Sequence, residues 1–232
     1  MVRHLFFDLD RTLWDFEKNS EKALHALFHS LGLDRNIPDF HFFHSVYKEK
    51  NAALWKAYGN GKISKEYLRS ARFEVTLSAF DISDREITEK LSQGYIELSP
   101  RQTALFPGAL TTLETLKTMG FPMHIITNGF KEVQYIKLEN SGLAPYFDSV
   151  VCSEELGKNK PSPDIFHYAL KKANARAENS IMIGDDPEVD IVGALNAGMK
   201  AVLFDPEALH QGVQGAPSIQ KLTDLPELLP FL

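Results

Sequence analysis

The sequence predicts an α/β protein, with a Rossmann-like, doubly wound parallel sheet and an inserted all-helical domain. Three observations lead to this prediction. A short apolar run at residues 5–7 ends in aspartates, helical periodicity then fills residues 15–105, and strand and helix patterns alternate from there on. Strands that are apolar throughout are typical of parallel sheets covered by helices on both faces. We therefore expect a core domain of residues 1–14 and 106–232, interrupted by a helical domain of residues 15–105.

The first strand is predicted from the segment Leu5 to Thr12, where an apolar run ends abruptly in polar side chains. The run is too short for a helix and is typical of a buried strand. Asp8 and Asp10 follow it with the alternate spacing of side chains along an extended chain. Two anionic groups at the exit of a buried strand repel each other, and a divalent cation is the simplest compensation. The segment therefore predicts a metal-assisted nucleophilic site.

The helical domain is expected to contain four helices and no strand. The apolar side chains of the first helix share one face: Ala23, Leu24, Leu27, Phe28 and Leu31. That helix is expected to end near Gly32, a second to span about 38–58, and a third to begin near Ser64. A fourth begins at Ser83, because Ser83 and Glu86 have the spacing of a capping box. This arrangement is typical of a helical bundle.

The remainder of the chain alternates between helix and strand. Strands are predicted at residues 121–126, 149–152, 181–183 and 201–204. Helices are predicted over 106–119, from about 130, from 162, and up to about 198. Ser162 followed by Pro163 is a strong helix start, with an N-cap and a proline at the first helical position. Residues 206–217 are expected to form a surface loop before a short C-terminal helix.

Composition restricts the classes of partner and of compartment. The formal charge of −6 over 232 residues argues against a nucleic acid polymer or an anionic membrane, although a small anionic substrate needs only a local positive pocket. Cys152 is the only cysteine, so no internal disulfide can form, and we expect a buried structural thiol. No apolar stretch approaches the length of a membrane span, and no signal-type core precedes Asp8. We expect a cytoplasmic protein and leave its oligomeric state open.

Polar residues follow four of the predicted strands. They are Asp8, Asp10 and Thr12 after the first strand, Thr127 and Asn128 after the second, Lys160 beyond the third, and Asp185, Asp186 and Asp190 after the fourth. Ligands of open parallel sheets bind outside the carboxyl ends of the strands. We therefore expect these side chains to converge although they are far apart in the chain.

These motifs, in this order, resemble those of the haloacid dehalogenase (HAD) superfamily. They read Asp8-Leu9-Asp10-Arg11-Thr12, Thr127-Asn128, Lys160-Pro161, and Gly184-Asp185-Asp186-Pro187-Glu188-Val189-Asp190. The helical insert after the first motif is similar to the C1 cap of subfamily I, so the resemblance covers the whole chain. Members are mostly phosphatases. The resemblance therefore implies a Mg²⁺-dependent hydrolase that acts on a small phosphorylated metabolite.

The resemblance also implies catalytic roles. Asp8 would attack phosphorus and form an aspartyl-phosphate, which splits a slow hydrolysis into two easier steps. Asp10 would protonate the leaving oxygen and then deprotonate the attacking water. Thr127, Asn128 and the neighbouring backbone N–H groups would bind the phosphoryl oxygens, and Lys160 would balance the charge of Asp8 and the phosphate.

A metal site is implied by the same resemblance. Asp8, the backbone carbonyl of Asp10, and Asp185 would hold Mg²⁺, which prefers a few carboxylates and retained waters. Asp190, or with less support Asp186, would hold a water molecule on the ion.

Ordinary structural roles remain open at several of these positions. Thr127 fits a helix N-cap, Lys160 a solvated loop lysine with Lys158 as a nearby competitor, and Asp190 a helix-surface charge. Asp186 fits a turn or N-cap better than a direct ligand.

Several other functions remain as alternatives. A phosphosugar mutase or a phosphoglycolate-type phosphatase would use the same motifs. A 2-haloacid dehalogenase normally lacks the second aspartate, so Asp10 argues for phosphoryl transfer. A receiver domain would place its motifs in another order, and a non-catalytic binding protein is disfavoured by the intact motifs.

Substrate choice is expected in the insert. Residues 51–55, 61–63 and 72–73 resemble the cap of the pyrimidine 5′-nucleotidase-like branch. The candidate contacts are Asn51, Trp55 and Arg72, because tryptophan can stack on a base and arginine can bind a carbonyl or carboxylate. Packing of the cap core by Trp55 and a structural ion pair of Arg72 are the competing interpretations.

Overall fold

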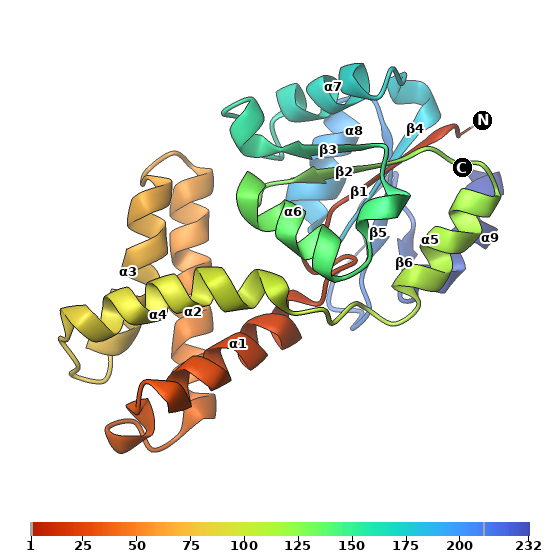
Figure 1. Ribbon diagram of the computed structural model, residues 1–232. Coiled ribbons are helices and arrows are strands. Elements are labelled where there is room, and N and C mark those ends of the chain that lie inside the picture. Colours follow the sequence, from red (N-terminus) through yellow and green to blue (C-terminus); the bar gives the residue numbers. More distant parts are fainter. Residues whose placement is uncertain (1, 211) are drawn as a thin grey trace. The chain divides into compact units, whose positions relative to one another are not determined.

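The computed structural model describes residues 2–210 and 212–232 (Figure 1). The chain forms two compact units. The first ends at Phe16 and resumes from Thr103 to Leu232, and the second consists of Glu17–Gln102. The boundaries expected from the sequence, after residues 14 and 105, lie a few residues from these.

The first unit contains a six-stranded sheet in the order β3-β2-β1-β4-β5-β6, and all its strands are parallel. The strands are β1 (His4–Phe7), β2 (Met123–Thr127), β3 (Ser149–Cys152), β4 (Ser180–Gly184), β5 (Lys200–Phe204) and β6 (Ser218–Ile219). β1 is central, since Phe6 pairs with His124 of β2 on one side and Met182 of β4 on the other. The order reverses between β1 and β4, where ligands of doubly wound sheets bind.

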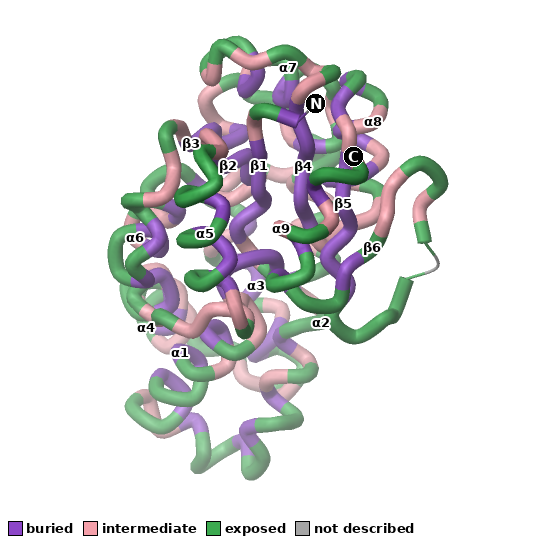
Figure 2. Tube along the Cα trace, turned by 90° about the vertical axis from the view of Figure 1, so that its right-hand side faces the viewer, coloured by how far each residue is buried: buried purple, intermediate pink, exposed green. Residues whose placement is uncertain are grey.

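Helices cover both faces of this sheet. On one face lie α5 (Ala109–Thr118), α6 (Lys131–Asn140) and α9 (Leu225–Leu228), and on the other α7 (Pro163–Lys172) and α8 (Gly193–Asn196). Alternate residues of β1 point to the two layers, because Leu5 and Phe7 pack with α5 and α6 while Phe6 packs with α7 and α8. The central strands are buried along their length (Figure 2). The predicted α/β fold is therefore confirmed.

The end of the sheet differs from the prediction. β5 is not the last strand, because Ser218 and Ile219 of β6 pair with Leu203 and Phe204. The prediction ended the strands at Phe204 and placed only a loop and a helix after it. A two-residue strand is too short to show any periodicity, so only its partner in the sheet reveals it.

Local helix signals are mostly where the sequence placed them. Ser162 caps α7 by accepting the N–H of Asp164, as predicted. The single helix expected after β4 begins instead as a π-helical segment, Pro187–Val192, that leads into α8.

The second unit contains α2 (Phe40–Gly59), α3 (Lys65–Ser78), α4 (Arg85–Leu98) and α1 (Phe16–Ser30), whose first residue belongs to the other unit. Their shared core includes Leu24, Phe28, Phe43, Phe73 and Leu91. The third helix begins near Ser64 as expected, and Ser64 is its N-cap. The prediction for α4 was wrong by one residue, because Asp84 and not Ser83 is the N-cap and accepts the N–H of Ile87.

Candidate active site

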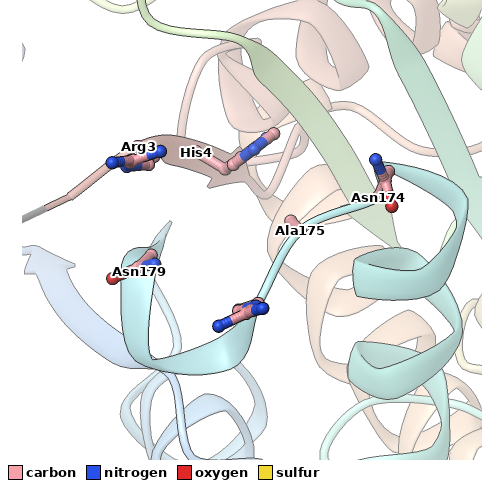
Figure 3. A pocket seen from close by; sticks show the side chains of 6 residues that line it. Arg3, His4, Asn174, Ala175 and Asn179 are labelled. Carbon is pink, nitrogen blue, oxygen red and sulfur yellow. The ribbon is translucent and has the colours of Figure 1, made fainter.

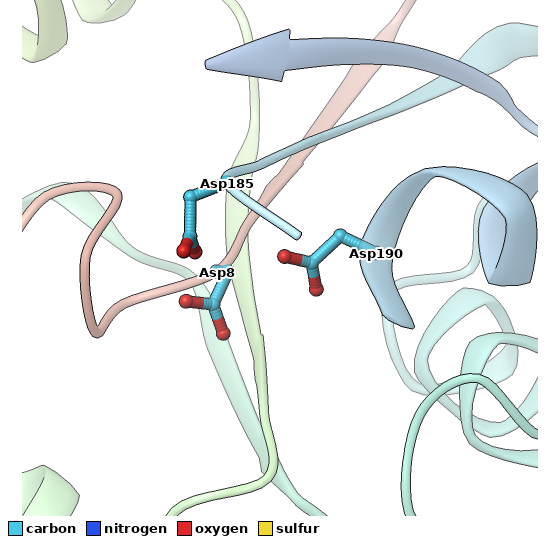
Figure 4. Close-up of side chains that lie close together, drawn as sticks. All are labelled: Asp8, Asp185 and Asp190. Carbon is cyan, nitrogen blue, oxygen red and sulfur yellow. The ribbon is translucent and has the colours of Figure 1, made fainter. Parts of the chain in front are cut away.

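Three carboxylates meet beyond the carboxyl ends of the central strands. Asp8 directly follows β1, Asp185 follows β4, and Asp190 lies in the π-helical segment. One carboxylate oxygen from each lies within 4.8 Å of the others, and the three side chains point toward one another (Figure 4). The convergence expected from the sequence is therefore present, although Asp8 and Asp190 are far apart in the chain.

Lys160 lies against this cluster. Its Nζ donates hydrogen bonds to Asp8 Oδ1 at 2.7 Å, Asp190 Oδ1 at 2.6 Å and the carbonyl of Ile126 at 2.8 Å. Only 2% of the side chain is exposed, so Lys160 is not a solvated loop lysine. Burial alone would lower the pKa of Lys160, but the carboxylates of Asp190 and Asp8 raise it above its ordinary value. The ammonium is therefore a permanent positive charge beside Asp8.

The charges of the cluster do not balance. Burial raises the pKa of Asp8 well above its ordinary value, with Lys160 opposing and Asp190 adding to the rise. Burial, and next the charge of Asp190, raise the pKa of Asp185 to about 7. Three carboxylates against one ammonium leave a formal excess of two negative charges when all are ionised. Carboxylate oxygens in this arrangement are a donor set that suits a hard divalent cation such as Mg²⁺.

Two neighbours of this cluster explain its geometry. The hydroxyl of Thr12 donates to Asp185 Oδ1 at 3.3 Å, which gives the last residue of the first motif a role in orienting the fourth. At Gly184 an added Cβ would lie 2.3 Å from Asp190 Oδ2, so only glycine leaves room for that carboxylate.

The structure settles where the two acidic residues of the fourth motif lie. Asp190 is 1% exposed and is paired with Lys160, so it is not a helix-surface charge. Asp186 is the N-cap of the π-helical segment, where its carboxylate accepts the N–H groups of Glu188 and Val189 at 2.9 Å. Asp186 therefore has the capping contacts expected for it.

Thr127 ends β2 beside the cluster and is buried. Its Oγ1 accepts the N–H of Gly129 at 3.0 Å, while the N-cap position of α6 is occupied by Phe130. Thr127 is thus not the helix N-cap. A hydroxyl that accepts one hydrogen bond still has its own hydrogen to donate, which suits an anionic oxygen.

Asn128 holds the backbone of Lys160. Its Nδ2 donates to the Lys160 carbonyl at 3.0 Å, and its Oδ1 accepts the Lys160 N–H at 2.8 Å. The side-chain amide is therefore engaged on both sides. An amide nitrogen carries two hydrogens, so this pairing does not use up the donors of Asn128.

Asp10 has partners that the sequence analysis missed. Lys137 Nζ donates to Asp10 Oδ1 at 2.5 Å, and Gln134 Nε2 donates to Asp10 Oδ2 at 3.1 Å. Both donors come from α6, where Gln134, Lys137 and Leu138 are its buried residues. Two polar residues three positions apart on the same helix face as a buried leucine were the available signal.

The candidate residues of the helical unit are mostly buried. Asn51 and Arg72 are each 5% exposed, and Trp55 is half-buried with its ring against Tyr58. The Arg72 guanidinium lies 4.6 Å from the ring centroid of Tyr95, so the cation stacks on aromatic rings. Arg72 Nε and Asn51 Oδ1 are buried without a hydrogen-bond partner.

Two other features lie away from this cluster. A hollow at the amino ends of β1 and β4 is lined by Arg3, His4, Asn174, Ala175, Arg176 and Asn179 (Figure 3). Its arginines are exposed, and in a parallel sheet this edge is opposite the carboxyl ends.

Cys152 is buried as expected, and burial raises the pKa of its thiol to about 12. Within residues 2–210 and 212–232, no helix is long and apolar enough to cross a membrane.

A comparison with models of protein families finds a match that includes the residues of the carboxylate cluster. A sequence model described as haloacid dehalogenase-like hydrolase matches residues 2–198. The chain belongs to this family. The family resemblance seen in the four motifs is thus confirmed.

Two relatives of this HAD-like chain carry the same activity in their names. This chain is 33% identical to pyrimidine 5′-nucleotidase YjjG of Escherichia coli strain K12 over 228 residues. The match covers 97% of this chain and 96% of YjjG. It is 32% identical to pyrimidine 5′-nucleotidase PynA of Streptococcus pneumoniae over 220 residues. That match covers 94% of this chain and 90% of PynA.

A solved structure supports the fold of the HAD-like chain over its whole length. The HAD-hydrolase YfnB of Bacillus subtilis, described as bound to magnesium, matches with a TM-score of 0.87 and 30% identity. The match covers 99% of each chain.

Proposed function

We propose that this protein is a Mg²⁺-dependent phosphomonoester hydrolase that forms an aspartyl-phosphate on Asp8. A small phosphorylated metabolite is its substrate, and a nucleoside 5′-monophosphate is the first candidate. The observation that carries the proposal is the buried contact of 2.7 Å between Lys160 Nζ and Asp8 Oδ1 at the carboxyl edge of the sheet. The nucleotide assignment is supported by the names of YjjG and PynA.

Asp8 supplies the nucleophile. Its Oδ1 accepts from Lys160, so the other carboxylate oxygen is the one we assign to the attack on phosphorus. A carboxylate nucleophile replaces one slow displacement by two faster ones. Lys160 is already hydrogen-bonded to Asp8 before substrate arrives, so its charge needs no rearrangement when negative charge accumulates on the phosphoryl group.

Thr127 and Lys160 are assigned to the phosphoryl oxygens. The Thr127 hydroxyl is anchored by Gly129, which restricts the direction in which its hydrogen points. Asn128 supports Lys160, because its side-chain amide binds the backbone carbonyl and N–H of Lys160 and so helps to place the ammonium. Fixed donors of this kind are worth about 10²–10³ in rate each.

Asp10 handles the protons. In its protonated form it gives its proton to the leaving oxygen as Asp8 forms its bond to phosphorus and the bond from phosphorus to the leaving oxygen breaks. The carboxylate left behind takes a proton from the water that then attacks the aspartyl-phosphate, which restores the acid. Asp8, Asp185 and the backbone carbonyl of Asp10 would hold Mg²⁺, which when bound supplies positive charge toward the phosphoryl group. Asp190 binds the same ammonium through its Oδ1 and so helps to orient Lys160.

Asn51, Trp55 and Arg72 are proposed as the substrate-selecting residues of the helical unit. A buried polar atom without a partner costs about 1–3 kcal/mol. Arg72 Nε and Asn51 Oδ1 are two such atoms, and a polar substrate group would give them partners. An arginine stacked on Tyr95 also leaves its guanidinium edge for planar carbonyl or carboxylate groups.

The test is phosphate release from a panel of monoesters, each with Mg²⁺ and with EDTA, and with Asp8→Asn as the control. The panel contains dUMP, UMP, dTMP, phosphoglycolate, glucose phosphates and a chromogenic aryl phosphate. Mg²⁺-dependent release that Asp8→Asn abolishes is the expected result. Release led by a sugar phosphate or by phosphoglycolate would keep the mechanism and reject the nucleotide assignment. No release from any ester, or activity retained by Asp8→Asn, would reject the proposal.

A further inference from the structure

The carboxylate of Asp10 is held on both oxygens by one helix. Lys137 binds Oδ1 and Gln134 binds Oδ2, and these donors are 4% and 1% exposed. The Asp10 side chain itself is 20% exposed. Both oxygens are thus fixed from the protein side, while an edge of the carboxylate stays accessible.

The ammonium group of Lys137 is buried, which is unusual for a lysine. A surface lysine extends its ammonium into water, and burying it is unfavourable unless specific partners replace the water. Here Nζ faces the Asp10 carboxylate and also lies 4.3 Å from the ring centroid of Trp14 and 5.8 Å from that of Phe16. Aromatic faces attract cations. The surroundings of Lys137 therefore hold its ammonium at one point, next to Asp10.

The turn after Asp10 brings Trp14 to this point. Trp14 donates its backbone N–H to Leu9 and accepts the N–H of Arg11, both at 2.9 Å. Arg11 adopts a φ of 67°, in the left-handed region that is unfavourable for residues other than glycine. The first motif thus closes on itself in a strained turn that places the Trp14 ring beside the ammonium bound to Asp10.

Gln134 reaches Asp10 because of a glycine in the second motif region. A Cβ added at Gly129 would lie 1.8 Å from Gln134 Nε2. The loop that follows Thr127 therefore leaves room for Gln134 only when it lacks a side chain at this position. The same loop joins β2 to α6, so the region proposed to bind phosphate and the supports of Asp10 belong to one packed segment.

We propose that Lys137 and Gln134 are positioning residues that hold the Asp10 carboxyl group, in the protonated form that the first step requires, for proton transfer to the leaving oxygen. This inference rests on the proposed function, in which Asp10 is the acid. A general acid acts only within hydrogen-bond reach of the atom it protonates, and a misplacement of about 1 Å can cost about 10²-fold in rate. Two donors on two oxygens fix the plane of the carboxylate as well as its position.

A merely structural role for the pair makes a different prediction. If Lys137 and Gln134 only stabilise the fold, their loss slows all substrates alike. If they position an acid, the loss depends on the leaving group. An alkoxide needs a proton as it departs, whereas 2,4-dinitrophenolate departs without one.

The experiment measures kcat/KM for phosphate esters whose leaving groups run from 2,4-dinitrophenol through phenol to an alkyl alcohol. This parameter covers only the steps up to transfer of the phosphoryl group to Asp8, so it excludes the later role of Asp10 with water. For Lys137→Met we expect a loss of ~30-fold or more with the alkyl ester and less than ~3-fold with the dinitrophenyl ester. Gln134→Met should show the same slope with smaller losses, because it removes an uncharged donor.

Lys131→Met is the matched control, since Lys131 is an exposed lysine of the same helix and we expect unchanged kinetics across the series. Circular dichroism and thermal unfolding accompany each variant, and Gln134→Met provides the test if Lys137→Met does not fold. Equal losses across the ester series in a folded variant would overturn the positioning role. If the wild-type chain hydrolyses none of the esters, the proposed function fails and this inference with it. Wild-type turnover with a flat response of the variants rejects only the positioning role.

Discussion

The Lys160 ammonium lies 2.7 Å from Asp8 Oδ1 and 2.6 Å from Asp190 Oδ1. One buried cation thus links the carboxylates of the first and the last motif. This relationship explains why Asp190 is buried among charges and why Gly184 must lack a side chain. The stability and the activity of the site therefore depend on the balance between one ammonium and its carboxylates, and single substitutions of these residues should change both.

Removing the charge of Lys160 should reduce both activity and stability. Lys160→Met leaves Asp8 and Asp190 as buried carboxylates without a cation, and breaking such a contact costs about 3–5 kcal/mol. Urea unfolding at neutral pH measures the stability, and phosphate release measures the activity. Lys158→Met is the control, because Lys158 is exposed two residues away and should change the free energy of unfolding by less than about 0.5 kcal/mol. Equal effects of the two variants would contradict the assigned role of Lys160.

A methyl group at position 184 should displace Asp190. The added Cβ of Gly184→Ala would lie 2.3 Å from Asp190 Oδ2, and overpacking of this kind costs about 1–3 kcal/mol. We expect a lower unfolding midpoint and a marked loss of turnover, because Lys160 loses its second carboxylate. Gly59→Ala is the matched control, since no atom lies within 4 Å of its added Cβ. A Gly184→Ala variant as stable and active as Gly59→Ala would show that Asp190 does not need its observed position.

Mg²⁺ should stabilise the folded protein without any substrate. The ion relieves repulsion among Asp8, Asp185 and Asp190, and a ligand at about 100 times its Kd stabilises by about 2.7 kcal/mol. Thermal unfolding with and without Mg²⁺ measures this effect. Metal binding requires ionised carboxylates, and the pKa of Asp185 is raised to about 7, so the shift should be larger at pH 8 than at pH 6. Asp185→Asn should lose most of the shift, and an unchanged shift in that variant would place the ion elsewhere.

His124 should make the protein sensitive to acid. Burial, followed by the charge of His4, lowers the pKa of His124 from 6.5 to about 4. The unfolded chain therefore binds the proton more readily, so the stability present above pH 6.5 is lost as the pH falls toward 4. The size of the loss is on the order of 1–3 kcal/mol after allowance for solvent screening. We expect urea unfolding to show it between pH 7 and pH 4 in the wild type and to show less of it in His124→Phe.

The test of His124 must separate the effect of pH from the general effect of the substitution on stability. His124 stacks on His4 and hydrogen-bonds Ser149, so His124→Phe alters stability at every pH. Only the difference between the two pH values bears on the prediction. An identical acid-induced loss in both proteins would assign the sensitivity to other groups.

Much of the core could be predicted because its signals are local. An apolar run that stops at Asp8 defines a strand and its exit, and Ser162-Pro163 defines the start of α7 within a few residues of chain. Parallel strands then place their carboxyl ends at one edge, which is why Asp8 and Asp185 were expected together. At the start of α4 the capping-box spacing of Ser83 and Glu86 gave a position that was wrong by one residue, because Asp84 is the N-cap.

By itself the sequence determined the family, the positions along the chain of the strands that carry the motifs, and the residue types of the site. Only the tertiary structure decided how those residues are held. It paired Asp10 with Lys137 and Gln134, Asn128 with the Lys160 backbone, and β6 with β5. The physical reason is that periodicity reports which face of an element is buried but not which side chains oppose it. Such pairings depend on how distant segments pack against one another.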